Sequence, residues 1–444
     1  MTFLDLRAWL HYLEECGQLR RVSDASDIRY DIPRILEGHD GQQAVLFENV
    51  SEYAPVRVIG GASTTRPQIA ASFGMSQEKL LSGYIDALEH PIAPAEVTSG
   101  EAPVLEVHES EVRLDRLPAP WHHEKDSGKY ITAAMAIAQD PASGIQNWSI
   151  HRLQINDERH LGALIVPRDL WRIFSRLEAQ GQDLPVALVI GLPPAYLLAS
   201  QAVVPFGFNE AHIAGGLLHQ PVPVVRSPRY GILVPAFAEY LLEGRILARQ
   251  RAPEGPFGEF PRTYGPPSDK PVLEIDEVFH RANPIFQTIL PASREHMLLG
   301  AIPREASIYE AIKHVSSNIR DVVLTVAGGC RYHVVISMTP RRKGEAKNVV
   351  VAAFAGFTEI KRVVVVDEDV DISNAEEVEW AIATRVQPHR DVVIIEEALG
   401  SPLDPSAGEG GQTSKWGIDA TIPVDAHRER YERIRTPRHI SSPS

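Results

Sequence analysis

Short hydrophobic runs and helical spacings alternate over the first hundred residues. Leucines at helical spacing between residues 6 and 19 predict an N-terminal helix, with Thr2 and Asp5 at the positions of a capping box. A strand is predicted at residues 56–61, and a second helix at residues 76–90, begun by Ser76. This mixture is typical of an α/β domain.

The middle of the chain is dominated by short apolar runs that Gly and Pro separate. Its high proline content favours a barrel or sandwich over a doubly wound sheet, with a single helix predicted at residues 171–180. The predicted strands lie at residues 131–138, 147–155, 161–166 and 186–190.

From residue 286 onward, strand-like and helical patterns alternate, which predicts a second α/β layer with a helix at residues 374–386. A Gly/Ser/Pro-rich loop is predicted at 400–414, and a disordered tail from residue 436. The predicted strands are 321–327, 334–338, 348–357, 361–367 and 391–396. Together the patterns predict three domains, at residues 1–105, 106–285 and 286–444.

Charge and composition exclude several classes of function. The 444 residues carry a net charge of −14, which disfavours binding to nucleic acid or an anionic membrane. The uncharged stretch 184–208 holds four prolines, so strand, turn and short helix in a buried core are expected rather than a membrane span. With only Cys16 and Cys330, disulfide scaffolds and cysteine zinc sites are excluded. No signal peptide is recognised, and we expect a cytoplasmic protein.

The common catalytic motifs are absent. The sequence contains no P-loop, zincin, C-x-x-C, nucleophile-elbow or strand-linked G-x-G-x-x-G pattern. The adjacent His122 and His123 could ligate a metal, but neighbouring strand residues face opposite ways, so one packed and one exposed histidine are expected.

The segment from Ala252 to Glu259 is the most informative one for chemistry. Glu254 and Glu259 flank Gly-Pro-Phe-Gly, a turn with little conformational freedom. Burial could separate the pKa values of two carboxylates held in this way, so that one stays ionised while the other donates a proton. A solvated acidic turn is the alternative.

Three further segments carry polar groups in unusual settings. Asn147-Trp-Ser-Ile-His-Arg152 ends in an arginine suited to a carboxylate. Glu210 follows the long uncharged run, where an unpaired charge would be costly. Lys415 lies in a Gly-containing context suited to phosphate.

Taken together and in this order, these segments closely resemble the UbiD family of reversible decarboxylases, which use prenylated flavin mononucleotide (prenylated FMN). The resemblance runs from about Phe3 to Thr421, and its sharpest marks are Asn147–Arg152, the Glu210 segment, Glu254–Glu259 and Lys415–Thr421. It implies an α+β multidomain fold: an N-terminal α/β domain, a central flavin-reductase-like split β-barrel that binds the cofactor, and a C-terminal α/β domain for assembly.

The resemblance also implies a set of cofactor ligands. Asn147 and Glu210 match ligands of a divalent metal, usually Mn²⁺, that bridges the protein to the cofactor phosphate. The third protein ligand is open: His160 is one candidate, and the segment Pro167-Arg168 is the other. A K⁺ held by backbone carbonyls is also implied. The matching cofactor contacts are Asn147, Ile150, His151, Arg152, Arg168, Glu210 and Lys415.

In the catalytic network that the resemblance implies, Glu259 protonates the substrate carbon after CO₂ leaves. Glu254 and Arg152 hold its geometry and charge balance. The electrons released with CO₂ flow into the flavin. The active site is expected between the barrel and the C-terminal domain, where hinge motion could exclude water.

The polar residues His296, Arg304 and Arg331 suggest the substrate class. Two arginines and a histidine suit a second carboxylate and a ring heteroatom, as in the furan-2,5-dicarboxylate decarboxylase branch of the family. Pyrrole-2-carboxylate, other heteroaromatic acids and hydroxybenzoates are alternatives. Surface or interdomain salt bridges are the structural alternative for the arginines.

Two other classes of function compete with a decarboxylase: a non-catalytic assembly protein, and a metal-dependent hydrolase that uses Glu210 and histidines without flavin. The presence of Arg152, Glu254 and Glu259 together disfavours the first. The partners implied are a small aromatic or heteroaromatic carboxylate, CO₂, a flavin prenyltransferase that supplies the cofactor, and further copies of the chain in a dimer or hexamer.

Overall fold

A computed structural model describes residues 2–434 of the chain and resolves them into two compact units. The first comprises residues up to 307 together with 326–330 and 402–405, and the second comprises the remaining residues from 308 onward. The first two predicted domains both lie in the first unit, and the division into three domains stays a prediction. The predicted flexible tail lies outside the described residues.

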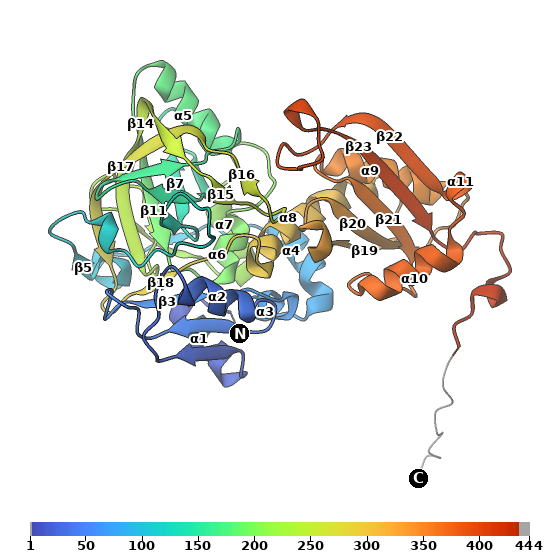
Figure 1. The fold of residues 1–444 in the computed structure, drawn as a ribbon, viewed down its shortest axis with the longest axis horizontal. Helices are drawn as coiled ribbons and strands as arrows, with labels where there is room; N and C mark the ends of the chain where they lie inside the picture. The colour runs from blue at the N-terminus through green and yellow to red at the C-terminus, as the bar shows by residue number, and fades with distance from the viewer. Residues whose placement is uncertain (1, 435–444) are drawn as a thin grey trace, which may run out of the picture. The chain divides into compact units, whose positions relative to one another are not determined.

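A four-stranded sheet in the order β1-β2-β3-β18 forms the N-terminal layer of the first unit (Figure 1). The N-terminal helix is confirmed, but Asp5 is itself the N-cap and accepts a hydrogen bond from Ala8 N at 2.7 Å, so the predicted capping box is wrong. Leu19 belongs to a strand rather than to the helix, because it pairs with Ala44. The elements are α1 (Leu6–Glu15), β1 (Leu19–Val22), α2 (Asp31–Gly38), β2 (Ala44–Phe47), β3 (Arg57–Gly60), α3 (Arg66–Ser72) and β18 (Ile285–Gln287).

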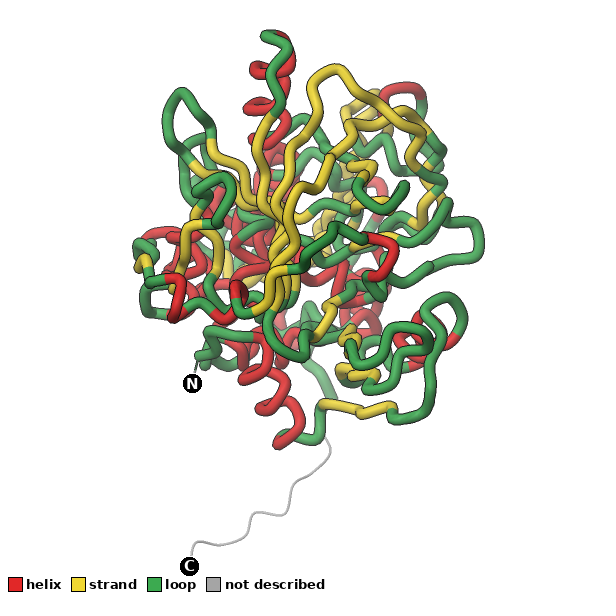
Figure 2. The backbone as a smooth tube through the Cα atoms, turned by 90° about the vertical axis from the view of Figure 1, so that its left-hand side faces the viewer, coloured by secondary structure: helices red, strands yellow, loops and turns green. Residues whose placement is uncertain are grey.

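A curled antiparallel sheet of nine strands, a half-barrel, forms the middle of the first unit (Figures 1 and 2). Its path runs β6-β9-β10-β17-β14-β11-β7-β8, with β5 added beside β17. At Gly244 a Cβ atom would lie 2.2 Å from Glu274 O, so this register break in the β14–β17 pair needs glycine. The strands are β5 (Val107–His108), β6 (Tyr130–Ile131), β7 (Met135–Gln139), β8 (Gln146–Ile150), β9 (Leu153–Ile155), β10 (His160–Ala163), β11 (Leu184–Ile190), β14 (Tyr240–Glu254) and β17 (Ser268–His280).

Helices and short strands fill the connections of this half-barrel. The uncharged run gives a strand and a short helix, as predicted, and the predicted helix 76–90 begins with a 3₁₀ turn before α4. Gly216 packs directly against the Ala87 backbone, which lets α7 lie close to α4. The elements are α4 (Leu80–Glu89), β4 (Ala95–Glu96), α5 (Asp169–Ala179), α6 (Pro194–Ala199), α7 (Glu210–Leu218), β12 (Pro223–Arg226), β13 (Leu233–Pro235), β15 (Phe257–Gly258) and β16 (Tyr264–Gly265). No helix among residues 2–434 is both long and apolar enough to cross a bilayer.

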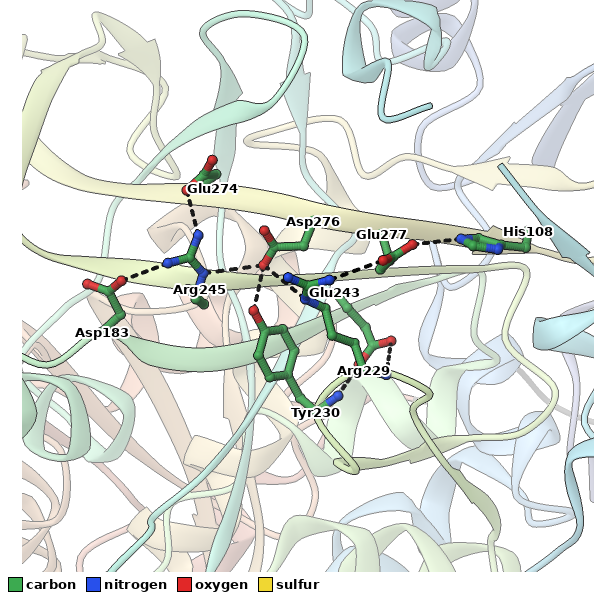
Figure 3. Close-up of polar contacts among 9 residues, drawn as sticks. All are labelled: His108, Asp183, Arg229, Tyr230, Glu243, Arg245, Glu274, Asp276 and Glu277. Carbon is green, nitrogen blue, oxygen red and sulfur yellow. Dashed lines mark hydrogen bonds and ion pairs between the residues drawn. The ribbon is translucent and has the colours of Figure 1, made fainter. Parts of the chain in front are cut away.

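A network of charged side chains ties the turn at residues 229–230 to strands β14 and β17 (Figure 3). Asp276 is at its centre: it accepts hydrogen bonds from Tyr230 Oη at 2.5 Å and Arg245 Nε at 3.3 Å. Burial opposes its charge, but these bonds outweigh burial and lower the pKa of Asp276.

Replacing Asp276 with alanine is expected to lower the free energy of unfolding by about 2 kcal/mol, because Tyr230 and Arg245 lose a charged acceptor. The pKa is lowered on folding, so this stabilisation is present above the unfolded value of about 3.9 and is lost as the pH falls through the folded value. Urea unfolding at pH 7 and pH 3 measures the effect. Equal losses at both pH values would contradict the assignment.

The second unit is built on a mixed five-stranded sheet in the order β19-β20-β21-β23-β22, with the two outer strands antiparallel to their neighbours. The predicted strand 348–357 is wrong and lies in helix α9, because Val349, Val350, Ala353 and Phe354 repeat at helical spacing and are buried. The elements are β19 (Ile319–Leu324), β20 (His333–Met338), α9 (Glu345–Gly356), β21 (Arg362–Asp367), α10 (Ala375–Arg385), α11 (Pro388–Asp391), β22 (Val392–Leu399) and β23 (Gln412–Ala420). Helix α8 (Arg294–Lys313) begins in the first unit and ends in the second.

Candidate functional site

Arg152 lies between two carboxylates that are more than a hundred residues away in the sequence. Its Nε and Nη2 donate to both oxygens of Glu254 at 2.9 and 2.8 Å, and its Nη1 donates to Glu259 Oε1. The Glu254 side chain is 0% exposed, and those of Arg152 and Glu259 are each 11% exposed. The structure therefore brings together the three residues predicted to be catalytic.

Burial and charge act in opposite directions on this trio. Burial disfavours the charge of Arg152, but the two carboxylates outweigh it and raise its pKa, so the guanidinium stays charged. Burial also raises the pKa of Glu259, although Arg152 works against this shift. The Glu259 carboxyl consequently holds a proton to higher pH than an ordinary glutamate.

The two glutamates lie at either end of the predicted Gly-Pro-Phe-Gly turn, which forms the start of the β15–β16 hairpin. Phe257 lies between them, with the Arg152 guanidinium 4.7 Å from its ring centre. A Cβ atom on Gly258 would lie 2.5 Å from His123 Nδ1, so only glycine allows this approach. The aromatic residue between the acids thus packs on their shared cation.

A polar cluster that the sequence did not reveal supports the first turn of this hairpin. Gly255 N donates to Tyr130 Oη at 3.2 Å and to Gln154 Oε1 at 3.1 Å. Ser127 Oγ lies 2.8 Å from the same tyrosine hydroxyl and donates to Gln154 at 2.9 Å. The backbone that follows Glu254 is thereby fixed.

Asn147 and Glu210, the two predicted metal ligands, are in contact. Asn147 Nδ2 donates to Glu210 Oε1 at 3.0 Å, and Trp148 N donates to Glu210 Oε2 at 2.9 Å. Glu210 is the first residue of α7 and is 4% exposed, and burial raises its pKa to about 7. No side-chain cation pairs with it among residues 2–434, so a divalent cation fits this buried carboxylate.

A hydrogen-bond chain continues from Asn147 along β8. Burial lowers the pKa of His151 to about 4, so its ring is neutral, and Nδ1 donates to Leu164 O at 3.1 Å. Nε2 must then accept from Ser149 Oγ, at 2.8 Å. The Ser149 hydroxyl has one hydrogen, and the bond to His151 Nε2 uses it. Asn147 Oδ1, 3.3 Å from that hydroxyl, therefore keeps its lone pairs for a cation. Ser149 had not been singled out from the sequence.

Of the remaining predicted cofactor ligands, Ile150 ends β8 half-buried, and Arg168 is exposed at the N-cap of α5. His160 bonds the Asp157 carboxylate at 2.9 Å rather than Asn147 or Glu210, so the third metal ligand stays open. Lys415 lies in strand β23 of the second unit, and its buried ammonium donates to Thr358 O. Burial lowers the pKa of Lys415.

The three predicted substrate contacts are buried or half-buried. His296 and Arg304 lie on α8, where His296 Nδ1 accepts from Ala292 N at 3.1 Å and Arg304 Nη1 donates to Gly300 O at 2.5 Å. Arg331 belongs to the second unit, with Nε 4.0 Å from Glu359. Both arginines are 7% exposed, so they are not surface ion pairs.

Glu259 also lines a cavity of about 770 Å³ within the first unit. His122 is packed, as predicted for one of the pair, but His123 is half-buried rather than exposed, and neither lies in a strand, so strand alternation does not set their environments. Among residues 2–434, no three His, Cys, Asp or Glu side chains cluster as a metal site. The cavity wall around Glu259 includes Trp121, His122, His123, Gly258, Tyr264 and Leu290.

Comparison with known proteins identifies a family over nearly the whole chain. The N-terminal, Rift-related and C-terminal domains of 3-octaprenyl-4-hydroxybenzoate carboxy-lyase (UbiD) match residues 10–88, 95–294 and 297–420. Anhydromevalonate phosphate decarboxylase of Methanothermobacter thermautotrophicus is 37% identical over 425 residues, which cover 96% of this chain and 99% of that protein.

Solved structures give the same result. The UbiD-class enzyme HmfF from Pelotomaculum thermopropionicum, in complex with FMN, has a TM-score of 0.96 and 46% identity, over 98% of this chain and 97% of that one. An evolved dimeric form of HmfF with prenylated FMN has a TM-score of 0.91 and 43% identity, with the same coverage.

Proposed function

The chain belongs to the UbiD family of carboxy-lyases, and on this premise we propose that it decarboxylates a small heteroaromatic acid, furan-2,5-dicarboxylate, to 2-furoate and CO₂. The observation that carries the proposal is the buried Arg152 shared by Glu254 and Glu259. The family match favours a decarboxylase over a metal-dependent hydrolase.

Prenylated FMN, when bound, supplies an electron sink for the electrons released with CO₂. The protein supplies the proton: Glu259 lines the cavity beside Trp121 and the histidines, where an aromatic acid can lie against it. Arg152 holds both carboxylate oxygens of Glu254 in place and balances the charge that Glu259 acquires after donating its proton.

The curled sheet is proposed to act as the split-barrel cofactor domain. Strand β8 ends at Ile150, and His151 and Arg152 follow it directly. Arg168 is the N-cap of α5, which packs on β8, and the free N–H groups at the start of this helix suit a phosphate. Lys415, a buried cation with one carbonyl acceptor, retains donors for a phosphate. K⁺ remains part of the proposal without an assigned site.

Mn²⁺ is proposed to bind Asn147 Oδ1 and Glu210, both of which are hard oxygen ligands. Glu210→Gln should weaken Mn²⁺ binding by more than the roughly 10–100-fold typical for loss of an outer-sphere partner. Electron paramagnetic resonance of free Mn²⁺, titrated with the protein, measures the change.

Glu243→Gln is the matched control, because Glu243 is a fully buried carboxylate that also accepts backbone N–H groups, at 3.0 and 3.1 Å. Equal Mn²⁺ affinity in wild type and Glu210→Gln would remove Glu210 from the metal site.

The substrate is proposed from His296, Arg304 and Arg331, whose buried polar groups suit a second carboxylate and a ring heteroatom. The test uses protein co-expressed with a flavin prenyltransferase and follows CO₂ release. The substrates are furan-2,5-dicarboxylate, 2-furoate, pyrrole-2-carboxylate and 4-hydroxybenzoate. Turnover of the dicarboxylate alone supports the proposal, whereas turnover of a monoacid alone returns the two arginines to structural roles.

Anhydromevalonate phosphate is a second candidate substrate, because decarboxylases of that compound are 37% identical over 96% of the chain. Its phosphate would also suit buried arginines. Adding it to the same panel separates the two candidate substrates.

The oligomeric state is a separate part of the proposal. We propose a homo-oligomer, either a dimer or a hexamer, and one related structure is an evolved dimer. Cytoplasmic location stays a prediction.

A further inference from the structure

Asp126 is a fully buried carboxylate beside the hairpin that carries Glu259, and the function proposed above gives it no role. Its side chain is 0% exposed. Oδ1 accepts a hydrogen bond from Gly258 N at 2.9 Å, and Oδ2 accepts one from His123 N at 2.9 Å. One carboxylate thus joins the residue before Glu259 to the wall of the cavity.

The segment that carries Asp126, residues 123–130, is bound to both strands of the hairpin; we name it the anchor turn. Ser127 N donates to Pro256 O at 3.0 Å, and Lys125 N donates to Tyr264 Oη at 3.3 Å. Tyr130 Oη accepts from Gly255 N at 3.2 Å. The anchor turn therefore sets the position of the hairpin, and with it the distance between Glu259 and Arg152.

Asp126 is also one of the charges that act on Glu259. Among the charged groups that act on Glu259, Arg152 favours its ionised form, and Glu254 and Asp126 favour its protonated form. His123 is the ionisable neighbour of Asp126 itself, with Nδ1 3.6 Å from Oδ2. A buried negative charge at Asp126 consequently helps Glu259 to keep its proton.

We propose that Asp126 is a positioning residue for the proton donor: through its bonds to Gly258 N and His123 N it fixes the hairpin that carries Glu259. The inference rests on the proposed decarboxylase function. It adds a residue that acts through Glu259 rather than on the substrate.

Asp126→Asn removes the charge while an amide oxygen can still accept from Gly258 N. The alkaline limb of the pH profile of kcat/KM should move to lower pH by about 0.5–1 unit, because Glu259 then loses its proton more readily. Asp276→Asn is the control. It removes the charge of a buried aspartate that lies in the first unit but outside the anchor turn, so the alkaline limb of the pH profile should not move. An unmoved limb in a folded Asp126→Asn protein would overturn the proposal.

A second variant and a second readout distinguish failure of the role proposed for Asp126 from failure of the proposed decarboxylase function. Asp126→Glu keeps the charge but displaces the hairpin, so it should lower kcat without moving the limb; wild-type kcat would overturn the positioning role. Infrared titration of the Glu259 carboxyl, identified by difference against Glu259→Gln, needs no substrate. A lower titration midpoint in Asp126→Asn supports the role of Asp126 even if no acid in the substrate panel is turned over. An unchanged midpoint contradicts it.

Discussion

Glu259→Gln is expected to reduce turnover by about 10²–10⁴-fold, the usual contribution of a positioned proton donor. The amide keeps the size of the side chain and can still accept from Arg152 Nη1, so the clamp on Arg152 largely survives. It has no proton to give to the substrate carbon. Cofactor and Mn²⁺ content should stay near wild type, because Asn147 and Glu210 are unchanged.

The measurement is CO₂ release under saturating substrate, with flavin absorbance and metal content determined on the same preparation. Glu124→Gln is the matched control: Glu124 lines the same cavity, is exposed, and has no ion pair among residues 2–434. Its turnover should remain within a few-fold of wild type. Full activity of Glu259→Gln would exclude Glu259 as the proton donor.

Arg152→Ala is expected to abolish turnover and to lower the free energy of unfolding by about 3–5 kcal/mol, because it leaves the Glu254 carboxylate buried without its cation. Arg152→Lys should restore charge but not the two parallel bonds to Glu254, so stability should recover more than activity. Arg152→Ala combined with Glu254→Gln should recover part of the stability but no activity, because only Glu259, whose pKa burial raises, is then left without the arginine.

Denaturant unfolding of the single and double variants measures these energies. Arg251→Ala is the control, on β14, the strand that ends at Glu254: it breaks a similar pair of bonds to Glu178, at 2.7 and 2.9 Å, but the Arg251 side chain is 30% exposed. Its cost should be at most about 1 kcal/mol. A cost for Arg152→Ala no larger than this would show that the buried clamp is not important for stability.

Local patterns predicted most of the regular elements that have a clear period. One example is the helix at Leu6–Glu15, whose buried apolar side chains lie on one face. Another is the strand at Leu184–Ile190, whose apolar side chains are nearly all buried in the core. The pattern failed at Glu345–Gly356, where consecutive valines predicted a strand. Packing decided this case: Val350 contacts Gly417 of β23 from a helix.

The sequence by itself determined the chemical groups and, through the resemblance of four motifs, the family; the comparisons confirm that family. The resemblance implied that Arg152, Glu254 and Glu259 act in one network. Only the tertiary structure identified Asp126, Tyr130 and Gln154 as their supports, and Ser149 as the partner of His151. These residues act through hydrogen bonds between strands and turns distant in sequence, and hydrogen bonds of that kind leave no period or spacing in the chain.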